Sequence, residues 1–339
     1  MWWTAGICLE NEKKGETMQL SMAYFFDENN AKIDIAKQLN VPYVVTNCSH
    51  KGDEVPKEGW DFAPFIEKVH RFEDEGLKVE VVESPTPLER VKLGIEGWER
   101  ETEAFLQLIE LLDKLDIHTI CYNWMPVIGW FRSRKNIKTR GGAVVTGFFE
   151  EDMRGMPLTD AGVVQASKLW DTLQRFLETV VPECEKHHVK LALHPDDPPV
   201  RSLRGIDRIL ISRDAFDKVF RLVNSKANGM TLCQGSFSAM GESPSEMIRY
   251  FGKKEKIFFA HFRDIRGSSS AFTETFHDDG QTNMLECMKA YHEIAFKGCI
   301  RPDHVPGMVG EKVEHSGYSN LGNLYALGYM RGLMEATGQ

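Results

Sequence analysis

From residue 18 onward, short apolar and β-branched runs alternate with longer segments whose apolar residues recur at helical spacing. This alternation predicts about eight βα units. No glycine-rich dinucleotide fingerprint follows the first strand, so a (β/α)8 TIM barrel is favoured over a doubly wound sheet. The expected strands are 18–26, 41–46, 77–82, 118–122, 189–193, 230–233, 257–260 and 299–300. The expected helices are 31–39, 65–72, 98–115, 163–181, 214–223, 245–251, 284–294 and 321–334.

The domain organisation follows from this pattern. A length of 339 residues fits two domains or one α/β barrel. We expect residues 1–17, which carry a polar run, to be an N-terminal extension, and residues 18–339 to form a single barrel domain. The stretch from 123 to about 157 shows little periodicity, and a long loop insertion is expected at about 128–157. Such loops are typical of active-site flaps or interfaces.

Charge and composition restrict the function. The formal net charge is -9, from 50 acidic and 41 basic side chains, which disfavours nucleic acid and anionic membranes as partners. No stretch approaches the roughly 18 apolar residues of a membrane span. The first residues lack the basic region and long apolar core of a signal peptide. Seven scattered cysteines indicate reduced thiols, so we expect a cytoplasmic protein.

One strand end stands out in the second half of the chain. Residues 190–199 read Lys-Leu-Ala-Leu-His-Pro-Asp-Asp-Pro-Pro, so a buried strand is followed at once by a polar loop stiffened by prolines. Proline cannot continue a central strand, and the strand must therefore end at His194. In α/β enzymes this is where catalytic residues gather.

Three further strand ends carry metal-binding side chains: Cys233, His261 and Asp303. Together with His194 they come from four consecutive strands, spaced by about one βα unit each. Each alone has a simpler interpretation, namely a small buried thiol, a hydrogen-bonded core histidine or a turn carboxylate. Four in register indicate a divalent transition metal. Zinc suits these ligands by softness, whereas manganese or iron would need an open, partly water-filled shell.

These stretches resemble the mannonate dehydratases, metal-dependent barrels of the xylose-isomerase-like group. The most specific matches are His-Pro-Asp-Asp-Pro-Pro at 194–199 and Arg-Pro-Asp-His at 301–304. Further matches lie at 121–127, 227–236, 261–264 and 317–319. The resemblance implies Mn2+, with Fe2+ or another divalent transition metal as the alternative, bound by His194, Cys233, His261 and Asp303. It also implies dehydration of D-mannonate to 2-keto-3-deoxy-D-gluconate, a step of hexuronate catabolism.

Dehydration of a sugar acid needs a base for the proton beside the carboxylate and an acid for the leaving hydroxyl. Tyr318 and His304 are the candidates for this pair, next to Asp303. Tyrosine is a poor base at its pKa of about 10, so Tyr318 would need the metal or a cation nearby; a packed aromatic is the simpler interpretation. Arg263 is a candidate clamp for the substrate carboxylate, although an ion pair with an aspartate explains it nearly as well. The remaining candidates for substrate binding, which could also be plain surface polar residues, are Asn123, His277 and Asp278.

Three strand-end loops depart from the family pattern. After Met-Pro-Val at 125–127 the family usually continues Asp-Trp-Thr-Arg-Thr, whereas this chain gains basic residues in 128–135. The loops at 49–52 and 305–307 also differ. These departures bear on which small sugar acid is bound. Alternatives are an isomerase or epimerase on the same barrel, or a metal-stabilised binding protein. A homo-oligomer, dimer or tetramer, is expected from the resemblance.

Overall fold

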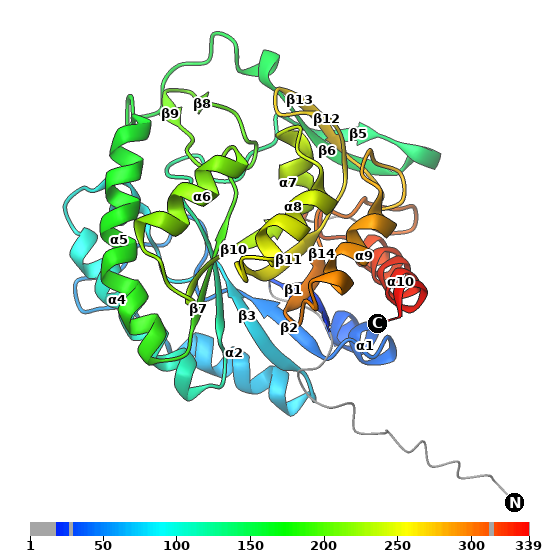
Figure 1. The fold of residues 1–339 in the computed structure, drawn as a ribbon, viewed down its shortest axis with the longest axis horizontal. Coiled ribbons are helices and arrows are strands. Elements are labelled where there is room, and N and C mark those ends of the chain that lie inside the picture. Colours follow the sequence, from blue (N-terminus) through cyan, green and yellow to red (C-terminus); the bar gives the residue numbers. More distant parts are fainter. Residues whose placement is uncertain (1–17, 27–29, 312–314, 339) are drawn as a thin grey trace, which may run out of the picture.

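The computed structural model describes residues 18–26, 30–311 and 315–338, so the expected extension 1–17 lies outside the described residues. Eight parallel strands close into a barrel in the spatial order β1-β14-β11-β10-β7-β4-β3-β2 (Figure 1). This confirms the predicted (β/α)8 barrel. The barrel strands are β1 (Gln19–Tyr24), β2 (Tyr43–Thr46), β3 (Lys78–Glu83), β4 (Thr119–Asn123), β7 (Lys190–His194), β10 (Asn228–Cys233), β11 (Ile257–Phe262) and β14 (Cys299–Pro302).

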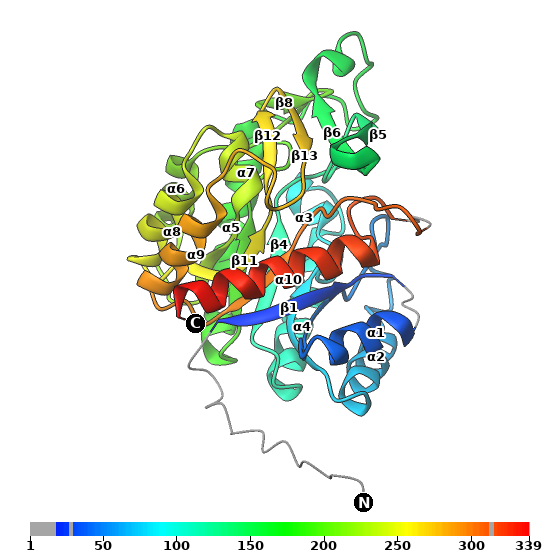
Figure 2. The ribbon, with the colours of Figure 1, turned by 90° about the vertical axis from the view of Figure 1, so that its right-hand side faces the viewer.

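Helices surround the barrel because each strand is followed by at least one helix before the next barrel strand begins (Figures 1 and 2). The helices are α1 (Asn30–Gln38), α2 (Ala63–Asp74), α3 (Glu89–Leu93), α4 (Trp98–Lys114), α5 (Ala166–Lys186), α6 (Arg213–Leu222), α7 (Gln234–Ala239), α8 (Pro244–Gly252), α9 (Met284–Glu293) and α10 (Asn320–Thr337). Within the described ranges, no helix combines the length and apolar character that crossing a membrane requires.

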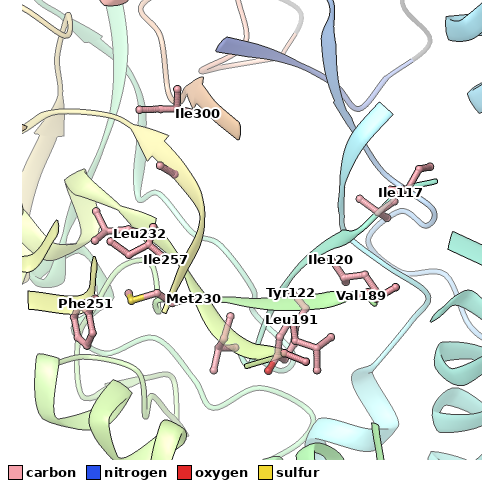
Figure 3. Packing of buried hydrophobic residues seen from close by; sticks show 14 of the residues in the cluster. Ile117, Ile120, Tyr122, Val189, Leu191, Met230, Leu232, Phe251, Ile257 and Ile300 are labelled. Atoms are coloured by element: carbon pink, nitrogen blue, oxygen red, sulfur yellow. The ribbon is translucent and has the colours of Figure 1, made fainter. Parts of the chain in front are cut away.

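The strands bury both faces, and the two faces differ. Alternate side chains such as Ile120, Leu191 and Leu232 belong to the large cluster between strands and helices, part of which Figure 3 shows. The intervening residues, among them Cys121 and Ala192, fill the barrel interior. Because side chains alternate with a period of two along a strand, the next inward residues reach the carboxyl-terminal rim of the barrel.

The expected irregular segment 128–157 contains regular structure. It holds the strands β5 (Arg134–Lys138) and β6 (Val144–Phe149), separated and followed by single 3-10 turns. β6 pairs with β13 (Ala271–Glu274), which pairs with β12 (Ile265–Ser268), giving a four-stranded antiparallel sheet at one end of the barrel (Figure 2). The partner strands are over a hundred residues away, so local periodicity could not reveal this pairing. A short hairpin, β8 (Ser202–Leu203) with β9 (Ile206–Asp207), was also not predicted.

Helix α5 differs from the predicted 163–181 at both ends. It begins later because Val164 pairs with the β8–β9 hairpin: its N–H donates to the Gly205 carbonyl at 2.9 Å. It continues beyond Val181 through Pro182 to Lys186. Continued burial of its apolar face, which includes Cys184, accompanies this extension.

Candidate metal centre and active site

The rim of the barrel carries one layer of inward-facing polar side chains. Strand register aligns Asn123 with His194, Cys233 with His261, and His261 with Arg301. Asn123, His194 and Arg301 each lie two residues beyond a small interior residue, namely Cys121, Ala192 and Cys299, and His261 lies two residues beyond the interior ring of Phe259. Because side chains two positions apart point to the same face of a strand, these polar side chains also point inward and form a ring at the rim.

The four predicted metal ligands converge in this layer. His194 Nε2 lies 3.2 Å from His261 Nδ1, and the ligand atoms of His194, Cys233 and His261 all lie within 4.8 Å of one another. An oxygen of Asp303 lies 3.6 Å from His261 Nδ1. Two imidazole nitrogens and a sulfur thus lie close together, and a carboxylate oxygen lies beside one of the two imidazoles. This donor set fits a divalent transition ion.

Neighbouring groups orient the two histidines within this donor set. His194 Nδ1 donates to the Pro195 carbonyl at 2.6 Å, which leaves Nε2 free as a ligand. Burial lowers the pKa of His194, so its ring is neutral, as metal binding requires. The other nitrogen of His261 lies 3.4 Å from Glu83 Oε1. Glu83 therefore stands behind His261 as carboxylates commonly stand behind metal-bound histidines.

Arg301 joins Glu83 to Asp303. Its guanidinium donates to both oxygens of Glu83, at 2.9 and 3.0 Å, and to Asp303 Oδ1 at 2.8 Å. Burial raises the pKa of Glu83, but Arg301 and His261 outweigh it and hold the pKa at about 2. Burial also opposes ionisation of Asp303, yet His304 and Arg301 hold its pKa well below its usual range. Both carboxylates are therefore ionised at neutral pH.

A second buried network lies behind Cys233. Arg132 and Arg263 each pair with both Asp197 and Glu274, at 2.6–2.8 Å, and all four side chains are at most 1% exposed. Arg263 Nη1 also lies 3.5 Å from Cys233 Sγ. The network thus brings a positive charge to the sulfur and ties the 128–157 segment, through Arg132, to the metal centre.

The charges around the ligands do not balance among themselves. Four carboxylates share three guanidinium groups, which leaves one negative charge before the thiol is counted. These groups are the side chains of Glu83, Asp197, Glu274 and Asp303, and of Arg132, Arg263 and Arg301. A bound divalent cation would compensate this excess, which agrees with the donor set. The structure therefore supports a site for a divalent metal.

The predicted acid–base candidates His304 and Tyr318 both line the same cavity. Burial lowers the pKa of His304 to about 4, so its imidazole is neutral at pH 7; its ring stacks on Trp130 with centroids 5.0 Å apart. Burial, reinforced by Asp303, raises the pKa of Tyr318 well above 10. Arg301 lowers that pKa, but too little to offset burial. The phenol therefore keeps its proton, which suits a proton donor and not a base.

The predicted substrate-binding residues separate into two groups. Asn123 lines the cavity, and its Oδ1 accepts hydrogen bonds from Lys92 Nζ and the Met125 N–H, both at 3.1 Å. Its NH2 group is thereby left for a ligand. The other three do not line the cavity. Arg263 is saturated by the two carboxylates described above, and His277 donates to the Phe262 carbonyl at 2.6 Å. Asp278 pairs with Arg140 on the surface.

The cavity has a volume of about 500 Å3 and opens at the carboxyl-terminal end of the strands. It is lined by Phe25, Phe26, Asn47, Ser49, His50, Lys51, Glu83, Ser84, Cys121, Tyr122, Asn123, Met125, Trp130, Lys135, Thr146, His194, Asp197, His261, Arg301, Asp303, His304, His315, Ser316 and Tyr318. A separate hollow at the opposite end of the barrel contains none of the four converging ligands. Barrel enzymes place their chemistry at the carboxyl-terminal end.

Several residues of the site were not predicted. Glu83 and Arg301 follow the same period of two as the ligands, since each lies two positions beyond an inward residue, Val81 or Cys299. Extending the predicted alternation by one step would have found them. Arg132 and Glu274 carry no such signal, because their contact joins segments 142 residues apart.

Comparisons with known proteins agree with this geometry. The family model described as D-mannonate dehydratase (UxuA) matches residues 18–161 and 158–339. The chain is 32% identical to a mannonate dehydratase of Thermotoga neapolitana, covering 92% of this chain and 96% of that protein. It is 33% identical to mannonate dehydratase 2 of Halalkalibacterium halodurans, covering 94% and 99%.

Solved structures give the same result. The crystal structure of mannonate dehydratase from Streptococcus suis serotype 2 superposes with a TM-score of 0.87 at 27% identity, covering 95% of this chain and 94% of that one. A D-tagatose 3-epimerase-like protein, 15% identical with a TM-score of 0.59 and covering 95% and 98%, shares the fold alone. The chain belongs to the mannonate dehydratase family and is therefore an enzyme of the hydro-lyase class.

Proposed function

We propose that this enzyme removes water from D-mannonate to give 2-keto-3-deoxy-D-gluconate. The observation that carries the proposal is a cavity lined by His194, His261, Asp303, His304 and Tyr318, with the buried thiol of Cys233 close to the two histidines. The family relationship supports the reaction class, and the volume of about 500 Å3 accommodates a small sugar acid.

We infer that the four ligands hold Mn2+, with Fe2+ as the alternative. The carboxylate and the two imidazoles suit either ion, and the thiol adds affinity for a transition metal over magnesium. When bound, the ion would act as a Lewis acid on the substrate carboxylate and the neighbouring hydroxyl. Arg301 and Glu83 keep Asp303 and His261 in place for this role.

His304 serves as the base in this proposal. Its neutral ring accepts the proton of the carbon beside the carboxylate, and the C–H electron pair forms a carbon–carbon double bond. Tyr318 donates its proton to the hydroxyl on the next carbon, whose C–O bond breaks and releases water. The resulting enol becomes the 2-keto acid by proton transfer. The opposite pKa shifts of the two residues support this division of roles.

In this proposal Asn123 orients the substrate, and Trp130 orients the base. The NH2 group of Asn123 donates to a substrate oxygen beside the metal ligands, since its own oxygen is held by Lys92. Trp130 stacks on His304 and fixes the plane of the imidazole. A base that cannot rotate keeps its nitrogen aimed at one proton, which favours the reaction.

The test combines metal content with turnover. Wild-type protein should hold about one Mn2+ per chain by mass spectrometry, whereas His194→Ala should lose it. The control is His118→Ala, because His118 lies at the opposite end of the barrel and should not affect the metal content. The metal-loaded wild type should form a 2-keto-3-deoxy acid from D-mannonate. Tyr318→Phe should lower kcat by roughly 10²–10⁴-fold. Equal metal in wild type and His194→Ala, or isomerisation without loss of water, would refute the proposal.

A further inference from the structure

The charged groups that line the cavity differ between its inner and outer parts. At the inner end, the carboxylates of Glu83 and Asp303 pair with Arg301, and Asp197 pairs with guanidinium groups behind the wall. Lys51 and Lys135 line the same cavity but are exposed to solvent. They therefore lie toward its mouth.

Lys51 comes from the loop after β2 and reaches across to the loop after β4. Its Nζ donates to the Ile128 carbonyl at 2.7 Å. The next residue, Gly129, has no side chain, and a Cβ added there would lie 3.8 Å from the same nitrogen. Among residues 18–26, 30–311 and 315–338, no carboxylate lies within ion-pair distance of Lys51.

Lys135 lies on β5, which follows Trp130 in the sequence, whereas Lys51 contacts Ile128, which precedes it. Its neighbour Arg134 is paired with Glu151 and Asp152 on the surface. Lys135 instead lines the cavity, and the described part of the chain offers it no ionic partner. Two ammonium groups thus line the cavity, one from a loop and one from β5, and no carboxylate of the described residues pairs with either.

We propose that the outer part of the cavity selects sugar acids that carry a second anionic group, a carboxylate or a phosphate, at the end remote from the metal-bound carboxylate. The inference rests on the proposed function, because that function directs the first carboxylate to the inner end. A chain of six carbons then points its far end toward Lys51 and Lys135. An anion there forms charge-assisted hydrogen bonds that a neutral hydroxyl cannot form.

The experiment compares three substrates that share the reacting end: D-mannonate, the diacid D-mannarate and 6-phospho-D-mannonate. In wild type, kcat/KM for at least one dianionic substrate should exceed that for D-mannonate by about tenfold, as expected of one charge-assisted contact. Lys135→Met and Lys51→Met should each reduce this ratio several-fold. Lys138→Met, on the same strand but outside the cavity lining, should leave it unchanged. Because the lysines are exposed, added salt should also reduce the ratio.

The two dianions distinguish a carboxylate from a phosphate at the far end. Equal or lower kcat/KM for both dianions would overturn the inference while leaving the dehydratase intact. An equal loss with all three substrates in Lys135→Met would also overturn it, because the lysine would then bind the shared carboxylate. If no substrate is dehydrated, calorimetric titration of Mn2+-loaded protein with D-mannarate still decides: lysine-dependent binding upholds the selectivity, and its absence refutes it.

Discussion

Replacing Arg132 with methionine tests the buried ion-pair network behind Cys233. The guanidinium donates to both oxygens of Asp197 at 2.8 Å and twice to Glu274 Oε1, at 2.6 and 2.9 Å, and its side chain is 0% exposed. Without it, two buried carboxylates share Arg263 alone. Removing one partner of a buried pair costs about 3–5 kcal/mol, so the free energy of unfolding should fall by about that amount.

A second substitution separates charge imbalance from lost packing. Changing Glu274 to methionine together with Arg132 leaves a single balanced pair, Arg263 with Asp197. The double variant should therefore be more stable than Arg132→Met alone by at least about 1 kcal/mol. Equilibrium urea denaturation followed by circular dichroism measures the free energies of unfolding of the single and double variants. A chelator is present so that metal binding does not contribute. Strict additivity of the two single losses would refute the reasoning.

The same variant has an expected pH dependence. Burial raises the pKa of Asp197, but Arg132 and Arg263 outweigh it and hold the pKa well below its ordinary value of about 3.9. A carboxyl with a lower pKa in the folded state adds stability above its unfolded pKa and loses it as the pH falls toward the folded pKa. The difference in the free energy of unfolding between wild type and Arg132→Met should therefore have its largest value above about pH 4 and decrease at lower pH. A difference independent of pH between 5 and 3 would contradict this.

Three further substitutions test other parts of the site and the barrel. Glu83→Gln should weaken Mn2+ binding by about 10–100-fold, because the carboxylate behind His261 is neutralised; calorimetric titration with metal measures this, and unchanged affinity contradicts it. Trp130→Ala should lower kcat more than it raises KM for D-mannonate, because the stacked His304 becomes mobile; an effect on KM alone would refute that role. Gly229→Ala should reduce the free energy of unfolding by about 1–3 kcal/mol, because the added Cβ would lie 2.3 Å from an aromatic ring and 2.6 Å from a backbone carbonyl. Urea denaturation measures this, and an unchanged free energy of unfolding would contradict it because β10 would then have to shift without cost.

The barrel and the proximity of the candidate ligands could be predicted because both depend on local pattern. A β-branched run such as 41–46 identifies a strand without knowledge of its neighbours. His194 could be found because Pro195 ends the strand directly after it. Since all eight strands are parallel, residues at their carboxyl ends meet at one rim, and four candidate ligands spaced by one βα unit are expected close together.

Partner choice among charged residues could not be predicted. Arg263 lies two residues after His261 in the sequence and was a candidate carboxylate clamp, yet Glu274 on β13 and Asp197 after β7 use its donors. Those contacts depend on how the small antiparallel sheet docks on the barrel, which no local periodicity encodes. The direction of the Tyr318 pKa shift likewise depends on burial among Phe25 and Phe26, a property of the assembled cavity.

The four candidate metal ligands and the loops after β2 and β4 lie on different halves of the barrel. The four candidate ligands lie on or directly after β7, β10, β11 and β14, which are consecutive neighbours in the closed sheet. The loops after β2 and β4, which supply Lys51 and Trp130, wall the cavity from the other half. A change in these loops can alter the charge that the substrate meets without moving a ligand atom. The loop departures at 49–52 and 128–135 fall in this half, whereas the departure at 305–307 directly follows Asp303 and His304. The first two loops can therefore differ from the family pattern while the candidate ligands keep their places on the strands.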